Sequence, residues 1–171
     1  NSRSSPQALD TQAGFDLSFS LQLLSEAHTS ANRAGYSLVM VCAQASQALE
    51  LDFWADHIWA QDYDAAQADR FVHGIDVAFD TTAALTPFKL AVRQQQFTLS
   101  AGGTPLLSGA LRDYRAGGFP YTTPNFLFLG DNSSRGNASS RLGLVSLSPV
   151  PEPAAGWLLA LGLAGLALRR R

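Results

Sequence analysis

The feature that most constrains this fold is a strict alternation of apolar and polar residues near the start of the chain. Apolar side chains occupy every second position from Phe15 to Leu23, with polar residues between them. Side chains of a β-strand point alternately to its two faces, so the pattern places all the apolar groups on one face. The segment therefore predicts a half-buried β-strand, and such a strand needs a second layer to cover it.

Other short segments also have the composition of strands. Residues 36–42 form a continuous apolar run, which is typical of a central strand. Glycine and proline mark turns at Gly102-Gly103, Gly117-Gly118, Pro120 and Pro124. About nine or ten short strands without helices predict an all-β fold, an antiparallel two-sheet jelly-roll sandwich. The remaining candidates are residues 49–55, 58–61, 77–79, 88–92, 97–99, 126–129 and 142–147.

The chain divides into three parts. Residues 1–14 are polar and predict a disordered N-terminal segment, whereas residues 15–149 carry the strand pattern of one sandwich domain. Residues 150–171 form a separate tail. The chain begins at Asn1 rather than Met and shows no signal peptide, so we expect part of its front to be missing.

Charge and cysteine content exclude several classes of protein. The 171 residues carry 12 Lys+Arg and 14 Asp+Glu, a formal net charge of -2. There is no basic stripe, so nucleic-acid binding is not expected. Cys42 is the single cysteine, which excludes a disulfide framework and zinc sites built on cysteine pairs. Because it lies in an apolar run, we expect Cys42 to be buried.

The tail predicts a hydrophobic C-terminal helix. Residues 154–168 are 15 uncharged residues, followed by three arginines. As a helix they would span about 22 Å, which is shorter than a bilayer core of about 30 Å. Arginine side chains that reach the interface could complete a transmembrane span. The alternative is a buried helix of a soluble protein, but such a helix would show a polar face and this run has none.

The tail resembles the PEP-CTERM sorting signal of Gram-negative bacteria. The residues that carry the resemblance are Pro151, Glu152, Pro153, Arg169, Arg170 and Arg171. The resemblance implies export, an inner-membrane-anchored precursor and removal of the tail by exosortase, a membrane-embedded cysteine peptidase. The released body would then go to the cell surface or the exopolysaccharide matrix.

The body resembles concanavalin A-like lectin and glucanase sandwiches of the LamG-like group. The similar stretches begin at Gly35 (GYSLVMV), Glu50 (ELDFWADHIWAQ), Gly74 (GIDVAFDTT), Phe97 (FTLSAGG) and Pro120 (PYTTPNFLFLGDNSS). The resemblance implies a sandwich whose sheet face or rim loops bind glycans or proteins.

The segment around Glu50 carries the chemistry most worth testing. In an extended strand Glu50, Asp52 and Trp54 share one face, while Leu51 and Phe53 point to the core. Laminarinase-type glycoside hydrolases on this sandwich add a second glutamate as acid/base, and neither Trp54 nor Ala55 supplies one. We therefore assign no catalytic residue. A polar binding face and a solvated strand face stay open, as does glycosidase activity.

Further candidates for ligand contact are aromatic and polar. Trp54 and Trp59 could stack on sugar rings, or one of them could belong to the core. Asn125, Asp131 and Asn132 flank a predicted strand and could reach a rim or simply form turns. An acidic loop could bind Ca²⁺ or be solvated. It contains Asp62, Tyr63, Asp64 and Asp69. No other cofactor and no metal site are expected, since His28, His57 and His73 are widely spaced.

Together these observations predict an exported, exosortase-processed surface or extracellular-matrix protein. Its sandwich is expected to bind glycan or protein without catalysis. The alternatives are a laminarinase-type glycoside hydrolase and a purely structural matrix protein.

Overall fold

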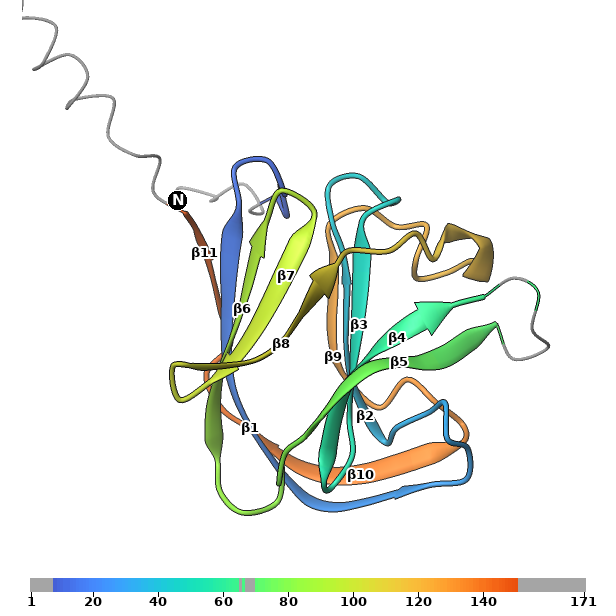
Figure 1. Ribbon diagram of the computed structural model, residues 1–171, viewed down its shortest axis with the longest axis vertical. Coiled ribbons are helices and arrows are strands. Elements are labelled where there is room, and N and C mark those ends of the chain that lie inside the picture. The colour runs from blue at the N-terminus through green and yellow to red at the C-terminus, as the bar shows by residue number, and fades with distance from the viewer. Residues whose placement is uncertain (1–7, 65, 67–69, 151–171) are drawn as a thin grey trace, which may run out of the picture.

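Two antiparallel β-sheets form the body of the protein (Figure 1). The computed structural model describes residues 8–64, 66 and 70–150. The strands are β1 (Phe15–His28), β2 (Tyr36–Val41), β3 (Ala48–Phe53), β4 (His57–Tyr63), β5 (Phe71–Ala78), β6 (Thr86–Arg93), β7 (Gln96–Ala101), β8 (Thr104–Ala110), β9 (Phe126–Gly130), β10 (Gly136–Leu142) and β11 (Ser146–Pro149). One short 3-10 helix, η1 (Arg115–Gly117), lies between β8 and β9. The predicted all-β jelly-roll sandwich is confirmed.

The long strand β1 organises the first sheet. The sheet order is β10-β1-β6-β7-β8, and β11 also pairs with β1. One edge of β1 pairs with β11 over residues 15–18 and with β10 over residues 21–28. Its other edge pairs with β6. The second sheet has the order β5-β4-β3-β2-β9.

The core between the sheets follows from the alternation of β1. Its five apolar residues from Phe15 to Leu23 are each at most 2% exposed. Phe19 stacks on Phe88 at 5.4 Å between ring centroids, and Phe53 meets both rings edge-on at 6.3 and 5.8 Å. Cys42 is also buried, as expected, and burial raises the pKa of its thiol to about 12.

A second, smaller apolar cluster covers the outer face of the second sheet. It contains Val39, Val41 and Ala48 from the sheet, and Tyr114 and Tyr121 from the segment between β8 and β9. Strands β2 and β3 are consequently buried on both faces, since every residue in them is buried. This explains the continuous apolar run of β2, and it sets the position of the site described below.

Two strands were missing from the sequence prediction. Strand β8 contains Pro105 and Gly109, and β10 has the sequence GNASSRL, so both have the composition of turns. Each becomes a strand because it pairs with a strong neighbour, β7 or β1. The predicted strand over 142–147 is wrong as one unit, because the chain leaves the ladder at residues 143–145 between β10 and β11.

Part of the N-terminal segment is packed rather than free. Leu9 is 2% exposed in the main core, and its backbone N–H donates to Oδ1 of Asn125 at 2.9 Å. The Thr11 hydroxyl donates to Oε1 of Gln47 at 2.6 Å. The expectation of disorder is therefore wrong for residues 8–14, because these contacts hold them.

The predicted C-terminal helix and the sorting residues after Val150 lie outside the described residues. In the part of the chain that the structure does describe, there is no helix with the length and hydropathy needed to cross a bilayer.

The Phe53 ring should be a major source of stability. It is completely buried and contacts three other aromatic rings. Replacing Phe53 by alanine should lower the free energy of unfolding by about 3–5 kcal/mol, measured by urea denaturation. Leu24→Ala is the control, because Leu24 is 51% exposed, and its effect should stay within about 0.5 kcal/mol. An equal effect of the two substitutions would contradict this account of the core.

Candidate functional site

A groove of about 490 Å³ opens on the outer face of the second sheet. Its floor is built by Val39 of β2, Glu50 of β3, Gln61 of β4 and Phe128 of β9. These side chains point away from the main core because they alternate with the residues that fill it, such as Leu38 and Leu51. The alternation of side chains along each strand therefore places these residues on the groove side of the sheet.

The segment between β8 and β9 forms one wall. Tyr114 anchors it, since its buried hydroxyl donates to the backbone carbonyl of Gln61 at 2.5 Å. Gly117 permits the close approach, because a Cβ there would lie 2.6 Å from Cζ of Phe71. Phe119 and Tyr121 follow on the same wall. Phe119 is 78% exposed, whereas Tyr121 is buried.

Glu50 lies at the floor with both carboxylate oxygens occupied. Oε1 accepts a hydrogen bond from Nδ2 of Asn132 at 2.7 Å, and Oε2 accepts one from the hydroxyl of Tyr121. Asp52 is two residues further along β3, where its Oδ1 accepts from the hydroxyl of Ser37, its direct partner in β2. The exposed fractions of Glu50 and Asp52 are 5% and 1%. The solvated strand face that the sequence left open is thus wrong.

Burial determines the titration of both carboxyls. It raises the pKa of Glu50, although the hydrogen bonds from Tyr121 and Asn132 and the positive charge of Arg33 act in the opposite direction. Burial raises the pKa of Asp52 further, and the nearby charge of Glu50 adds to this rise. Burial therefore favours protonation within this pair of carboxyls.

Asp52 and Trp59 each leave a polar atom unsatisfied. Oδ2 of Asp52 and Nε1 of Trp59 are buried, and neither has a hydrogen-bond partner among the described residues. The two residues are direct cross-strand partners in β3 and β4. The two side chains thus lie side by side in the sheet, each with one buried polar atom that no described residue satisfies.

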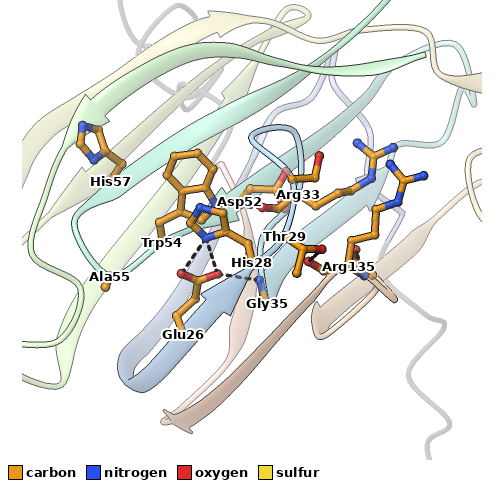
Figure 2. A network of polar contacts seen from close by, with 12 residues as sticks. Glu26, His28, Thr29, Arg33, Gly35, Asp52, Trp54, Ala55, His57 and Arg135 are labelled. Carbon is orange, nitrogen blue, oxygen red and sulfur yellow. Dashed lines mark hydrogen bonds and ion pairs between the residues drawn. The ribbon is translucent and has the colours of Figure 1, made fainter. Parts of the chain in front are cut away.

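Trp54 follows the end of β3 at Phe53, and its ring meets Trp59, the cross-strand partner of Asp52, edge-on at 5.7 Å. The indole therefore packs on the same side of the sheet as Asp52. Its Nε1 donates to the backbone carbonyl of Arg33 at 2.9 Å, and its ring stacks on His28 at 4.2 Å. Figure 2 shows the His28 ring against the indole, with the Glu26 carboxylate bridging His28 and the backbone of Gly35.

Trp59 is fully buried, so it offers no exposed ring face for a sugar. It stacks on His73 at 4.2 Å and meets Trp54 edge-on at 5.7 Å. His57 meets Trp54 edge-on at 6.4 Å. His73 also meets Trp54 edge-on at 5.1 Å, so all three histidine rings lie around the indole of Trp54. Neither Trp54 nor Trp59 is among the described residues that line the groove.

The polar residues predicted after β9 divide between two places. Asn132 and Asp131 both line the groove. Oδ1 of Asn132 lies 3.0 Å from the Ser37 hydroxyl that also contacts Asp52, so the two acceptors share one hydroxyl hydrogen. Asn125 lies at the opposite end of β9, where it has a left-handed backbone (φ 58°) and binds the N–H of Leu9. It has a turn role there, which its short amide side chain permits.

The acidic loop is tied into the fold at Asp62. Its carboxylate accepts from Nε of Arg112 at 2.8 Å, which lowers the pKa of Asp62. Asp69 lies outside the described residues. The described part of the chain contains no cluster of three or more His, Cys, Asp or Glu residues suited to a metal ion.

Sequence reasoning missed the residues that complete the groove. Arg33 comes from the β1–β2 loop, where its guanidinium donates to the backbone carbonyl of Phe71 at 2.9 Å and lies 5.7 Å from the centre of the Phe71 ring. Gln61, Phe119 and Tyr121 were also missed. The only sequence signal was the run Gly117-Gly118-Phe119-Pro120-Tyr121, in which aromatic residues alternate with turn formers.

The two antiparallel sheets define a β-sandwich of the jelly-roll type. The structure is similar to alginate lyase AlyC3, with a TM-score of 0.50 and 10% identity over 86% of this chain and 69% of that chain. It is also similar to alginate lyase A1-II′, with a TM-score of 0.48 and 14% identity over 86% of this chain and 66% of that chain. For sheep galectin-11 the TM-score is 0.47 and the identity 13%, over 85% of this chain and 99% of that chain. This chain thus spans about two-thirds of the length of A1-II′. At these identities the similarity concerns the fold alone.

The tail gives the more particular assignment. Residues 149–171 match the PEP-CTERM protein-sorting motif, which confirms the sequence prediction for this segment. The motif implies an exported, membrane-anchored precursor with exosortase as its processing partner. No curated protein matches the chain in sequence.

The buried Asp52 should make stability depend on pH. Because its pKa is higher in the folded protein than in the unfolded chain, the wild type should lose stability as the pH rises above about 4. Asp52→Asn removes the titrating group and therefore this loss. The free energy of unfolding of the variant, relative to that of wild type, should thus be higher at pH 8 than at pH 4. Each tenfold difference in proton affinity corresponds to about 1.4 kcal/mol.

The measurement is urea denaturation at both pH values. Asp113→Asn is the control, because the ion pair with Arg115 lowers the pKa of that exposed carboxyl and the rise should be absent. Parallel pH profiles for wild type and Asp52→Asn would contradict the raised pKa.

Proposed function

We propose that this protein is an exported glycan-binding protein whose groove on the second sheet holds the sugar without catalysis. The observation that carries the proposal is an exposed aromatic ring, Phe119, on the wall of a groove whose floor is a fixed polar cluster. Binding sites of this kind combine apolar walls with a few placed polar groups that fix orientation.

The aromatic wall supplies the apolar half of such a site. Phe119 meets Phe126 edge-on at 6.0 Å, and Phe71 and Phe128 also line the groove. The flat face of an aromatic ring matches the C–H face of a pyranose ring. Phe119 leaves most of its surface in solvent, so its ring is accessible to a ligand in the groove.

The polar half comes from side chains with remaining hydrogen-bond capacity. Gln61 donates through Nε2 to the backbone carbonyl of Val72 at 3.0 Å, which leaves its carbonyl oxygen as an acceptor. Asp131 lies at the rim, where Oδ1 accepts from the backbone of Ser133. Such groups suit sugar hydroxyls, which both donate and accept.

The state of the carboxyls supports binding over hydrolysis. A retaining glycosidase needs a free carboxylate nucleophile and a second carboxyl about 5–5.5 Å away. Both oxygens of Glu50 are already hydrogen bonded, and Asp52 lies beneath the surface beside it. Burial also raises the pKa of Tyr121, whose hydroxyl donates to Glu50, so this phenol is a poor base.

The sorting motif of the tail supports a proposal for the final location. The released body is proposed to reside on the cell surface or in the extracellular matrix. A purely structural matrix protein is the second candidate, but the exposed Phe119 beside an open groove favours ligand binding.

The test is glycan-array binding of the folded body, with and without Ca²⁺. Saturable binding in the micromolar range or weaker is expected, and Phe119→Ala should weaken it at least tenfold because the stacking face is lost. Leu144→Ala is the matched control, since Leu144 is 80% exposed but does not line the groove. Its affinity should equal that of wild type.

Two results would contradict the proposal. Absence of binding by a well-folded body would favour the structural matrix protein. Release of reducing ends from laminarin, lost in Glu50→Gln, would instead show a glycoside hydrolase.

A further inference from the structure

The sorting motif begins inside the folded body. The match covers residues 149–171, and Pro149 is the last residue of β11. Val150 follows, and its N–H donates to the carbonyl of Gly14 at 3.2 Å. In Figure 1, β11 runs along the edge of β1 up to the point where the described chain ends. No spacer separates the sandwich from Pro151.

This arrangement restricts access to the tail. The residues from Val150 to Pro153 can span about 14 Å when fully extended. If residues 154–168 lie in the bilayer, as their sequence predicts, the sandwich must sit against the membrane or against the peptidase. A peptidase needs several residues of extended backbone that are free of their own sheet, so cleavage commonly tracks the population of a locally opened state.

β11 is the strand best placed to open. It has four residues and pairs with β1 alone among the described strands, from Phe15↔Pro149 to Ser18↔Ser146. Ser148 and Pro149 are exposed, and Leu147 is the one β11 side chain that packs on the main core. Detachment of β11 therefore removes one apolar side chain, Leu147, from the core and breaks the short hydrogen-bond ladder between β11 and β1.

The rest of the fold would survive this detachment. Residues 15–18 of β1 keep their ladder with β6 on the other edge, and residues 21–28 keep β10. The chain already leaves the sheet before β11, where Leu144 is 80% and Val145 38% exposed. The N–H of Gly143 donates to the carbonyl of Ser20 at 2.7 Å, which fixes the point from which β11 could swing out.

We propose that residues 144–150 belong to the segment that exosortase engages, and that β11 must leave β1 before the tail is cut. Release of residues 144–149 adds about 20 Å of extended chain between the body and the membrane. The stability of the β1–β11 pairing then sets the rate of processing. The proposal concerns the tail and is independent of glycan binding.

The test locks β11 in place. Ser18→Cys with Ser146→Cys introduces a disulfide between direct cross-strand partners, a geometry that disulfides accept. The full chain, exported into inner-membrane vesicles that contain exosortase, is followed by gel shift as the tail is removed. The oxidised form should be processed at least tenfold more slowly than wild type, and reduction with dithiothreitol should restore the rate.

A matched lock elsewhere controls for the disulfide itself. Ala91→Cys with Thr98→Cys joins β6 and β7 in the same sheet and should be processed at the wild-type rate in both redox states. Leu147→Ala loosens β11 without a cross-link and should accelerate processing severalfold. Equal rates for the oxidised and reduced β1–β11 lock, or an unchanged rate for Leu147→Ala, would overturn the proposal.

Discussion

The hydrogen bonds accepted by Glu50 are the constraint on which the site depends. They join three segments that are distant in sequence, since Tyr121 and Asn132 lie 71 and 82 residues further along the chain. A carboxyl group in an apolar sheet is costly unless it is hydrogen bonded, so the fold is committed to keeping these partners in place. The wall of the groove and the turn after β9 are positioned as a result. The aromatic cluster of Tyr114, Tyr121 and Phe71 then packs around the same point.

Local patterns predicted the elements that local forces determine. The alternation in β1 and the apolar run of β2 lead directly to a half-buried and a fully buried strand. Strands β8 and β10 were missed because their residues have weak strand preference, and it is the ladders with β7 and β1 that make them strands. The period also placed Glu50 and Asp52 on one face, but it could not show that residues 111–125 fold back to cover that face.

The aromatic candidates show the same limit. Sequence favoured the two tryptophans because indoles commonly stack on sugars, yet Trp59 is covered by His73 and Trp54 is held by His28 and the carbonyl of Arg33. Phe119 is exposed instead because the turn at Gly117 and Gly118 brings it to the rim. Loop geometry and contacts with rings distant in sequence therefore determine which aromatic residue is exposed to solvent. The sorting motif was readable in full because it acts as a linear signal.

The stacked imidazole–indole pairs have an optical consequence. The protein has three tryptophans, and two of them, Trp54 and Trp59, each lie 4.2 Å from a histidine ring. Trp157 is the third, and it belongs to the tail that exosortase processing would remove. All indole emission of the mature body would then originate at one corner of the second sheet, where both rings stack on histidine side chains. After removal of the tail, the tryptophan fluorescence would come from Trp54 and Trp59 alone and would report on that corner of the second sheet.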